Sequence, residues 1–234
     1  MENTPESAGE PKRAAAPQHI KYWRAIIFEV IIILLAAILA GILVYWSFSS
    51  EGFVLFAFHP ALESLGMVLF MATAIYMCSS QFLTRPEPQP SKIRNFLHWL
   101  LNTISVFAIA VGVLIITWNK FLMDQNHFET AHAIVGLSSF ISMCLTVALG
   151  AASNSPKHRQ NIALKLFYLS FGLLTYWLGA ASLMLGFLKE DQTNGKFSVA
   201  LIAILAFWFI VSWKPLEDFC NRLQNACQSR NMIA

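Results

Sequence analysis

Charged residues are scarce in this sequence. Asp, Glu, Lys and Arg make up 12% of its 234 residues, whereas 56% are hydrophobic, and the mean hydropathy is +0.56. Soluble domains carry about twice that share of charge. The composition therefore excludes a soluble globular protein and predicts one that lies in a membrane.

Cysteine is also scarce, and its four positions form no framework. Cys78 and Cys144 fall within apolar runs, and Cys220 and Cys227 lie near the C-terminus. We therefore predict no disulfide. No Cys-x-x-Cys-His sequence is present, which excludes a covalently attached c-type haem.

The first 24 residues lack the apolar core of a cleavable signal peptide. We expect residues 1–24 to form a cytoplasmic tail, residues 25–213 a membrane domain, and residues 214–234 a second cytoplasmic tail. Gly/Pro-broken half-helices and an inverted repeat are lacking as well, which argues against a solute transporter.

Six apolar runs are long enough to cross about 30 Å of hydrocarbon. They lie at residues 25–46, 53–77, 96–118, 131–152, 162–188 and 197–213. These runs show no alternation of apolar and polar residues, so helices must satisfy the backbone within lipid. The predicted fold is an all-α membrane protein with six transmembrane helices, in which helices 2–5 form a four-helix core that can hold a cofactor.

Positive charge sets the predicted orientation in the lipid bilayer. Of the 16 Lys and Arg residues, 13 fall in the two terminal segments, between spans two and three, and around the connection of spans four and five; three fall on the opposite side. The positive-inside rule then places both termini in the cytoplasm, in an endomembrane or the plasma membrane. The net charge of +3 reflects this topology, and we expect no nucleic acid partner.

Three histidines fall within predicted spans, where an ionisable side chain is costly unless it is paired or ligated. His59 and His132 lie near the outer ends of spans two and four, and His98 lies near the inner end of span three. Because spans two and four run in the same direction, His59 and His132 have matching depth. Two imidazoles facing each other across a bundle are the axial ligands of a low-spin b-type haem. Interhelical hydrogen bonds are the alternative, and a zinc or copper site lacks further ligands at this level.

Four segments occur in order on the second to fifth spans: FHPALESLG at 58–66, LHW at 97–99, HFETAHAIVG at 127–136, and residues 165–186. They resemble the core-helix signatures of the cytochrome b561 family, and most closely its short animal branch, the cytochrome b561 domain-containing proteins. The resemblance implies two b haems, the outer held by His59 and His132 and the inner by His98 and the residue at position 168. It also implies an ascorbate-dependent transmembrane oxidoreductase, with monodehydroascorbate or a ferric chelate as acceptor.

Position 168 departs from the family, because the fifth-helix histidine is replaced by Tyr168. Three interpretations stay open: His98 as the sole ligand of the inner haem, Tyr168 as a phenolate ligand, or no inner haem with Tyr168 as a buried aromatic. A rival function is therefore a non-catalytic or mono-haem relative that acts as a sensor or interaction protein. Glu63, one turn after His59, is a second departure and is compatible with an interhelical hydrogen bond or a proton-linked role. A homodimer also stays open.

Four further residues are candidates for binding the cofactor or its partners. Lys92, Arg94 and Lys165 lie close to the depth of His98, where they could hold a haem propionate or anionic ascorbate through charge-assisted hydrogen bonds. The positive-inside rule explains these three residues equally well. His127 lies in the outer loop near the level of His59 and could contact a propionate or the acceptor.

The orientation can be tested with engineered glycosylation sites. We expect a site placed within residues 120–126 to be modified and one placed within residues 86–90 to remain unmodified, because the 13-to-3 distribution of basic residues puts only the first loop outside the cytoplasm. A mobility shift on gels that disappears after glycosidase treatment reports the modification. Modification at 86–90 instead would reverse the topology.

Overall fold

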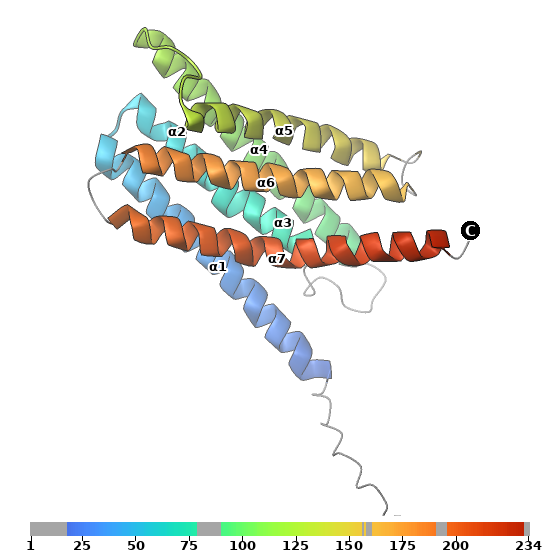
Figure 1. Cartoon of the computed structure of the whole chain (residues 1–234). Coiled ribbons are helices and arrows are strands. Elements are labelled where there is room, and N and C mark those ends of the chain that lie inside the picture. The colour runs from blue at the N-terminus through green and yellow to red at the C-terminus, as the bar shows by residue number, and fades with distance from the viewer. Residues whose placement is uncertain (1–17, 79–89, 156, 158–160, 191–195, 232–234) are drawn as a thin grey trace, which may run out of the picture.

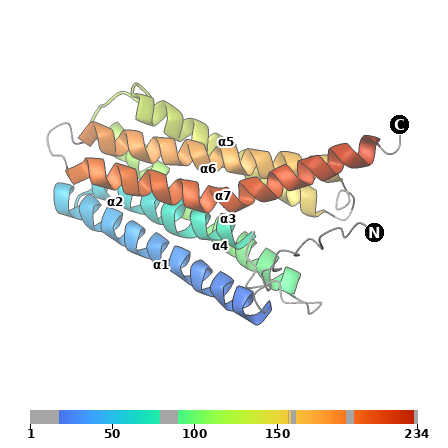
Figure 2. The same cartoon turned by 60° about the horizontal axis from the view of Figure 1, so that its bottom comes forward.

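The computed structural model describes residues 18–78, 90–155, 157, 161–190 and 196–231, and within them it contains helices and no β-strand (Figure 1). The elements are α1 (Gln18–Glu51), α2 (Leu55–Ser64), the π-helix η1 (Leu65–Met71), α3 (Ala72–Cys78), α4 (Pro90–Leu122), α5 (Ala131–Asn154), α6 (Ile162–Glu190) and α7 (Lys196–Asn231). Because α2, η1 and α3 follow one another without a break, they form a single span. Figure 2 shows the helices running alongside one another as a bundle.

Five helical segments of the described chain are long and apolar enough to cross a membrane: Ile26–Ser49, Leu55–Met77, Lys92–Leu122, Ala131–Asn154 and Ile162–Leu188. They correspond to the first five predicted spans, and the sixth predicted span lies inside α7. Large apolar side chains are exposed on the outside of the bundle, among them Phe107 and Ile202, at 71% and 66%. The all-α membrane fold is therefore confirmed, and the protein is a multi-pass integral membrane protein. Helix α7 continues as far as Asn231, so most of the predicted C-terminal tail is helical.

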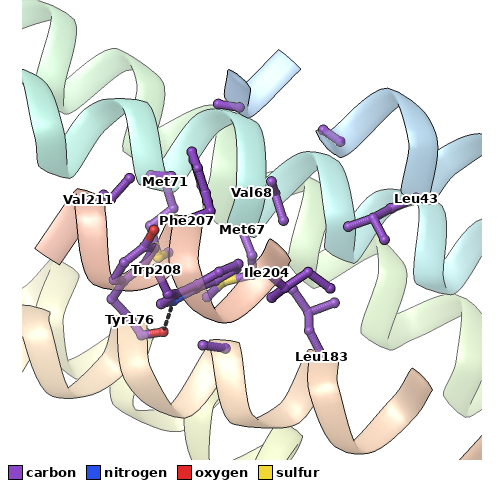
Figure 3. Packing of buried hydrophobic residues seen from close by; sticks show 14 of the residues in the cluster. Leu43, Met67, Val68, Met71, Tyr176, Leu183, Ile204, Phe207, Trp208 and Val211 are labelled. Carbon is purple, nitrogen blue, oxygen red and sulfur yellow. Dashed lines mark hydrogen bonds between the residues drawn. The ribbon is translucent and has the colours of Figure 1, made fainter. Parts of the chain in front are cut away.

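The buried core forms where the second span meets α1, α6 and α7. Figure 3 shows Met67, Val68 and Met71 of η1 facing residues of α6 and α7. Trp208 of α7 stacks on Tyr176 of α6 with ring centroids 4.9 Å apart, and its Nε1–H donates to the Tyr176 carbonyl at 3.0 Å. In lipid, close packing and interhelical hydrogen bonds of this kind hold helices together, because the surrounding acyl chains are as apolar as the side chains.

The π-helix η1 widens the middle of the second span. The backbone N–H of Ala72 bonds to the carbonyl of Met67, five residues earlier, as expected for π geometry. The hydroxyl of Ser105 on α4 donates to the Gly66 carbonyl at 2.8 Å and is fully buried. A Cβ on Gly66 would lie 2.6 Å from Cγ1 of Ile109, so glycine is what allows α4 to approach this turn.

The Ser105 hydrogen bond can be tested by the variant Ser105→Ala, with Ser138→Ala as the matched control. Ser138 is exposed, and its hydroxyl donates to Ile134 of its own helix. We expect Ser105→Ala to lower the free energy of unfolding by about 1 kcal/mol, since it removes a buried interhelical bond, and Ser138→Ala to have little effect. Unfolding of the purified protein in mixed micelles, followed by circular dichroism, measures both. Equal effects of the two variants would contradict a special role for the π turn's hydrogen bond.

Candidate functional site

His59 and His132 are each anchored to the main chain of a neighbouring helix. Nδ1 of His59 donates to the Gly112 carbonyl of α4 at 3.1 Å, and Nδ1 of His132 donates to the Ser182 carbonyl of α6 at 2.8 Å. A carbonyl can only accept, so each neutral ring carries its proton on Nδ1 and leaves Nε2 with a free lone pair. This is the arrangement in which a histidine can ligate a metal through Nε2.

The two imidazoles lie close together in the wall of one pocket. Their ring centroids are 6.2 Å apart and their planes are inclined by 67°. The pocket has a volume of about 330 Å³ and is lined by the second span together with α4, α5 and α6, the four helices of the predicted core. Most of its wall is apolar, with side chains such as Met67, Phe140 and Phe187. A mainly apolar cavity with a few converging polar groups is typical of a cofactor site.

Charged and polar groups reach this pocket from two directions. Glu63 lines it from α2, with Oε1 3.9 Å from Nδ1 of His59. Lys120 and His127 line it at the end of α4 and in the following loop, where His127 is exposed. The Lys120 ammonium donates to the Asn126 carbonyl at 3.0 Å, and Phe128, also in the pocket wall, has a positive φ of 59°. A bulky residue is strained at positive φ, which costs conformational free energy. The contacts of the surrounding loop must therefore impose this conformation on Phe128.

His98 and Tyr168 lie together at the other end of the same four helices. Nδ1 of His98 donates to the Ala74 carbonyl of α3 at 2.8 Å, and the Tyr168 hydroxyl lies 3.1 Å from Nε2. Because Nδ1 carries the ring proton, the tyrosine is the donor to Nε2. The Asn102 amide lies 3.2 Å from both ring nitrogens and donates to the His98 carbonyl at 2.9 Å. A Cβ on Gly150 of α5 would lie 3.0 Å from Cε2 of Tyr168, so the phenol packs directly on that helix.

Three of the predicted binding residues lie at this second end of the bundle. Lys92 and Arg94 are in the first turns of α4, and Lys165 is in the first turn of α6. Lys92 and Lys165 are exposed and Arg94 is half-buried. They stand on the helix ends next to the His98–Tyr168 pair, whereas His127 belongs to the His59–His132 pocket.

A family model described as eukaryotic cytochrome b561 matches residues 58–193, which include α4, α5, α6 and the second span from Phe58 onward. The chain belongs to the cytochrome b561 family. Among its relatives, the mouse (Mus musculus) protein "Transmembrane reductase CYB561D2" is 32% identical over 78% of this chain and 81% of the relative. The human (Homo sapiens) protein of that name is 30% identical over the same shares, and the mouse "Probable transmembrane reductase CYB561D1" is 26% identical over 59% and 61%. The predicted resemblance to this family and its short animal branch is thereby confirmed.

The sequence alone did not single out several groups that line or anchor the His59–His132 pocket. The Gly112 and Ser182 carbonyls that anchor the histidines are main-chain atoms, for which a sequence carries no residue-type signal. Lys120 is one of the three basic residues, with Lys189 and Lys196, that the positive-inside rule leaves on the outer side. Its position two residues beyond the apolar run 96–118 was the available signal, since a lysine there can reach back toward the histidine level.

Proposed function

We propose that this protein is a membrane-embedded oxidoreductase that transfers single electrons through a b-type haem held by His59 and His132. Ascorbate is the proposed donor, and monodehydroascorbate or ferric iron the proposed acceptor. The observation that carries the proposal is a pair of imidazoles that line one pocket, with ring centroids 6.2 Å apart and with both Nδ1 atoms hydrogen-bonded to main-chain carbonyls. The names of its relatives, which describe transmembrane reductases, support the same class of reaction.

The residues of the pocket fit the cofactor. A bond from an imidazole nitrogen to a metal is about 2 Å long. Two imidazoles that bind one metal from opposite sides therefore have ring centres about 6 Å apart, once the distance from each nitrogen to its ring centre is added. The separation of 6.2 Å agrees with this value. When bound, a haem with two histidine ligands supplies reversible one-electron chemistry at the iron.

The chain's own residues would orient and insulate this site. The Gly112 and Ser182 carbonyls fix which nitrogen of each ring is protonated, and they also keep both rings from rotating. The apolar wall excludes water, which strengthens every electrostatic interaction inside the pocket. Lys120 and His127 line the pocket where it meets the loop after α4, and there they would bind the carboxylates of a haem or an anionic acceptor.

The donor is proposed to approach the opposite end of the bundle. Lys92, Arg94 and Lys165 would attract anionic ascorbate there, with both termini and the tails 1–24 and 214–234 on the same, cytoplasmic side. Transfer across the whole membrane would further require a carrier near His98. The second candidate function, a mono-haem relative that senses or binds a partner, is favoured by the direct hydrogen bond between His98 and Tyr168.

The haem site is tested by His59→Ala and His132→Ala. We expect each variant to lower the content of bound haem at least about tenfold, because removing even a group that merely orients a metal ligand costs about 10–100-fold in affinity. Haem content per protein is measured after purification by the pyridine haemochromogen method, with circular dichroism to check folding. Added imidazole, which can replace the missing side chain, should restore part of the haem. Full haem retention in both variants would exclude the assignment.

Gly186 provides a second test of the pocket. A Cβ at this position of α6 would lie 3.1 Å from Cε1 and 3.2 Å from Nδ1 of His132, a ring that its bond to Ser182 already holds in place. We expect Gly186→Ala to displace the ring and weaken haem binding by about tenfold. The control is Gly41→Ala in α1, where an added Cβ would meet nothing within 4 Å. Haem titration of both variants measures the difference, and equal affinities would show that the ring tolerates the methyl group.

A further inference from the structure

The two ends of the four-helix core differ in the contact made by the pair of side chains found there, His59 with His132 at one end and His98 with Tyr168 at the other. At one end, His59 and His132 line one pocket with their ring centroids 6.2 Å apart. At the other end, the Tyr168 hydroxyl touches Nε2 of His98 at 3.1 Å. The same helices therefore line a pocket at one end and hold a hydrogen-bonded pair at the other.

The contact at the second end does not fit two ligands of one iron. Such ligands approach the metal from opposite sides with bonds of about 2 Å, so their ligating atoms lie about 4 Å apart. A separation of 3.1 Å is instead an ordinary hydrogen bond. It uses the only lone pair of His98 that could bind a metal, because Nδ1 is protonated and donates to the Ala74 carbonyl.

Groups on α3, α4 and α5 surround the contact between His98 and Tyr168 and keep the two side chains together. Ala74 of α3 accepts from the His98 ring, and Asn102 of α4 lies against both of its nitrogens. The Tyr168 ring rests on the backbone of α5 at Gly150, so the phenol has no room to withdraw toward that helix. Both side chains are partly buried.

We infer that His98 and Tyr168 form a structural hydrogen-bonded pair in place of a second haem, so that the protein carries one haem per chain. The inference rests on the proposed haem between His59 and His132 and deepens it. The substitution of tyrosine at position 168 is its cause: a phenol donates to Nε2, whereas a second neutral imidazole anchored through Nδ1 would present another lone pair and require a metal between the two. A single haem near one end leaves most of the membrane thickness without a carrier. Electron exchange then takes place from the side on which the His59–His132 pocket lies, and the donor site proposed at Lys92, Arg94 and Lys165 applies only to a protein that holds a second carrier near His98.

The experiment is a haem-to-protein ratio for wild type and three variants of the full-length protein, combined with low-temperature electron paramagnetic resonance. We expect a ratio of one in wild type and a single low-spin signal. His98→Ala should keep the full haem content, in contrast to His59→Ala. Tyr168→Phe, which removes only the hydroxyl and keeps the ring, should keep the haem content and the spectrum and lower the unfolding temperature. Tyr168→His should raise the ratio toward two and add a second low-spin signal.

The possible failures are distinct. A wild-type ratio of two, with loss of one haem in His98→Ala, would overturn the inference while leaving the His59–His132 site intact. A change of the wild-type spectrum in Tyr168→Phe would identify the phenol as an iron ligand and would also overturn it. If Tyr168→His stays at a ratio of one, residue 168 is not what excludes the second haem. A wild-type ratio of zero would instead refute the proposed function itself.

Discussion

The interaction on which this bundle depends is the hydrogen bond from a histidine ring to a main-chain carbonyl on another helix. His59, His98 and His132 each donate Nδ1–H in this way, at 2.8 to 3.1 Å. Lipid offers no water to satisfy a polar ring, so each imidazole needs a partner within the protein. A helical carbonyl already accepts one bond from its own helix but has a second lone pair to offer. This one hydrogen bond therefore gives the ring N–H an acceptor, joins two helices and fixes the tautomer of the histidine.

What differs between the two ends is the group that the remaining nitrogen meets. At His59 it meets a pocket and a second anchored imidazole, and at His98 it meets a hydroxyl donor. The same helices build both ends, and each of the three histidines is anchored in the same way. The difference lies in the residue beside the anchored histidine, which is a second anchored histidine, His132, at one end and Tyr168 at the other. Function in this fold is thus decided locally, although the scaffold is shared by the whole family.

The membrane fold could be predicted from the sequence because long apolar runs determine helical spans almost alone, and the equal depth of His59 and His132 followed from counting along two of them. The π turn at Leu65–Met71 could not, since its residues are apolar and compatible with an ordinary α-helix. The contact between His98 and Tyr168 also could not be predicted from the sequence. Depth can be counted along a sequence, but the rotation of α4 and α6 about their axes depends on packing against every neighbour.

The π segment has a consequence for how this chain should be aligned with its relatives. A π turn takes up about one residue more than an α turn, whereas each residue of an α-helix advances the chain by about 100° around its axis. A relative could lose one residue between Leu65 and Met71 and form a regular α-helix there. The residues that correspond to His59, before this turn, and to the Ala74 carbonyl, after it, would keep their present directions. The same loss from a regular α-helical part of the span between His59 and Ala74 would turn the Ala74 carbonyl relative to His59 by about 100° and so away from His98. A one-residue gap within η1 in an alignment would therefore leave the directions of the flanking side chains unchanged. The residues before Leu65 and after Met71 should be aligned with their counterparts in the relative.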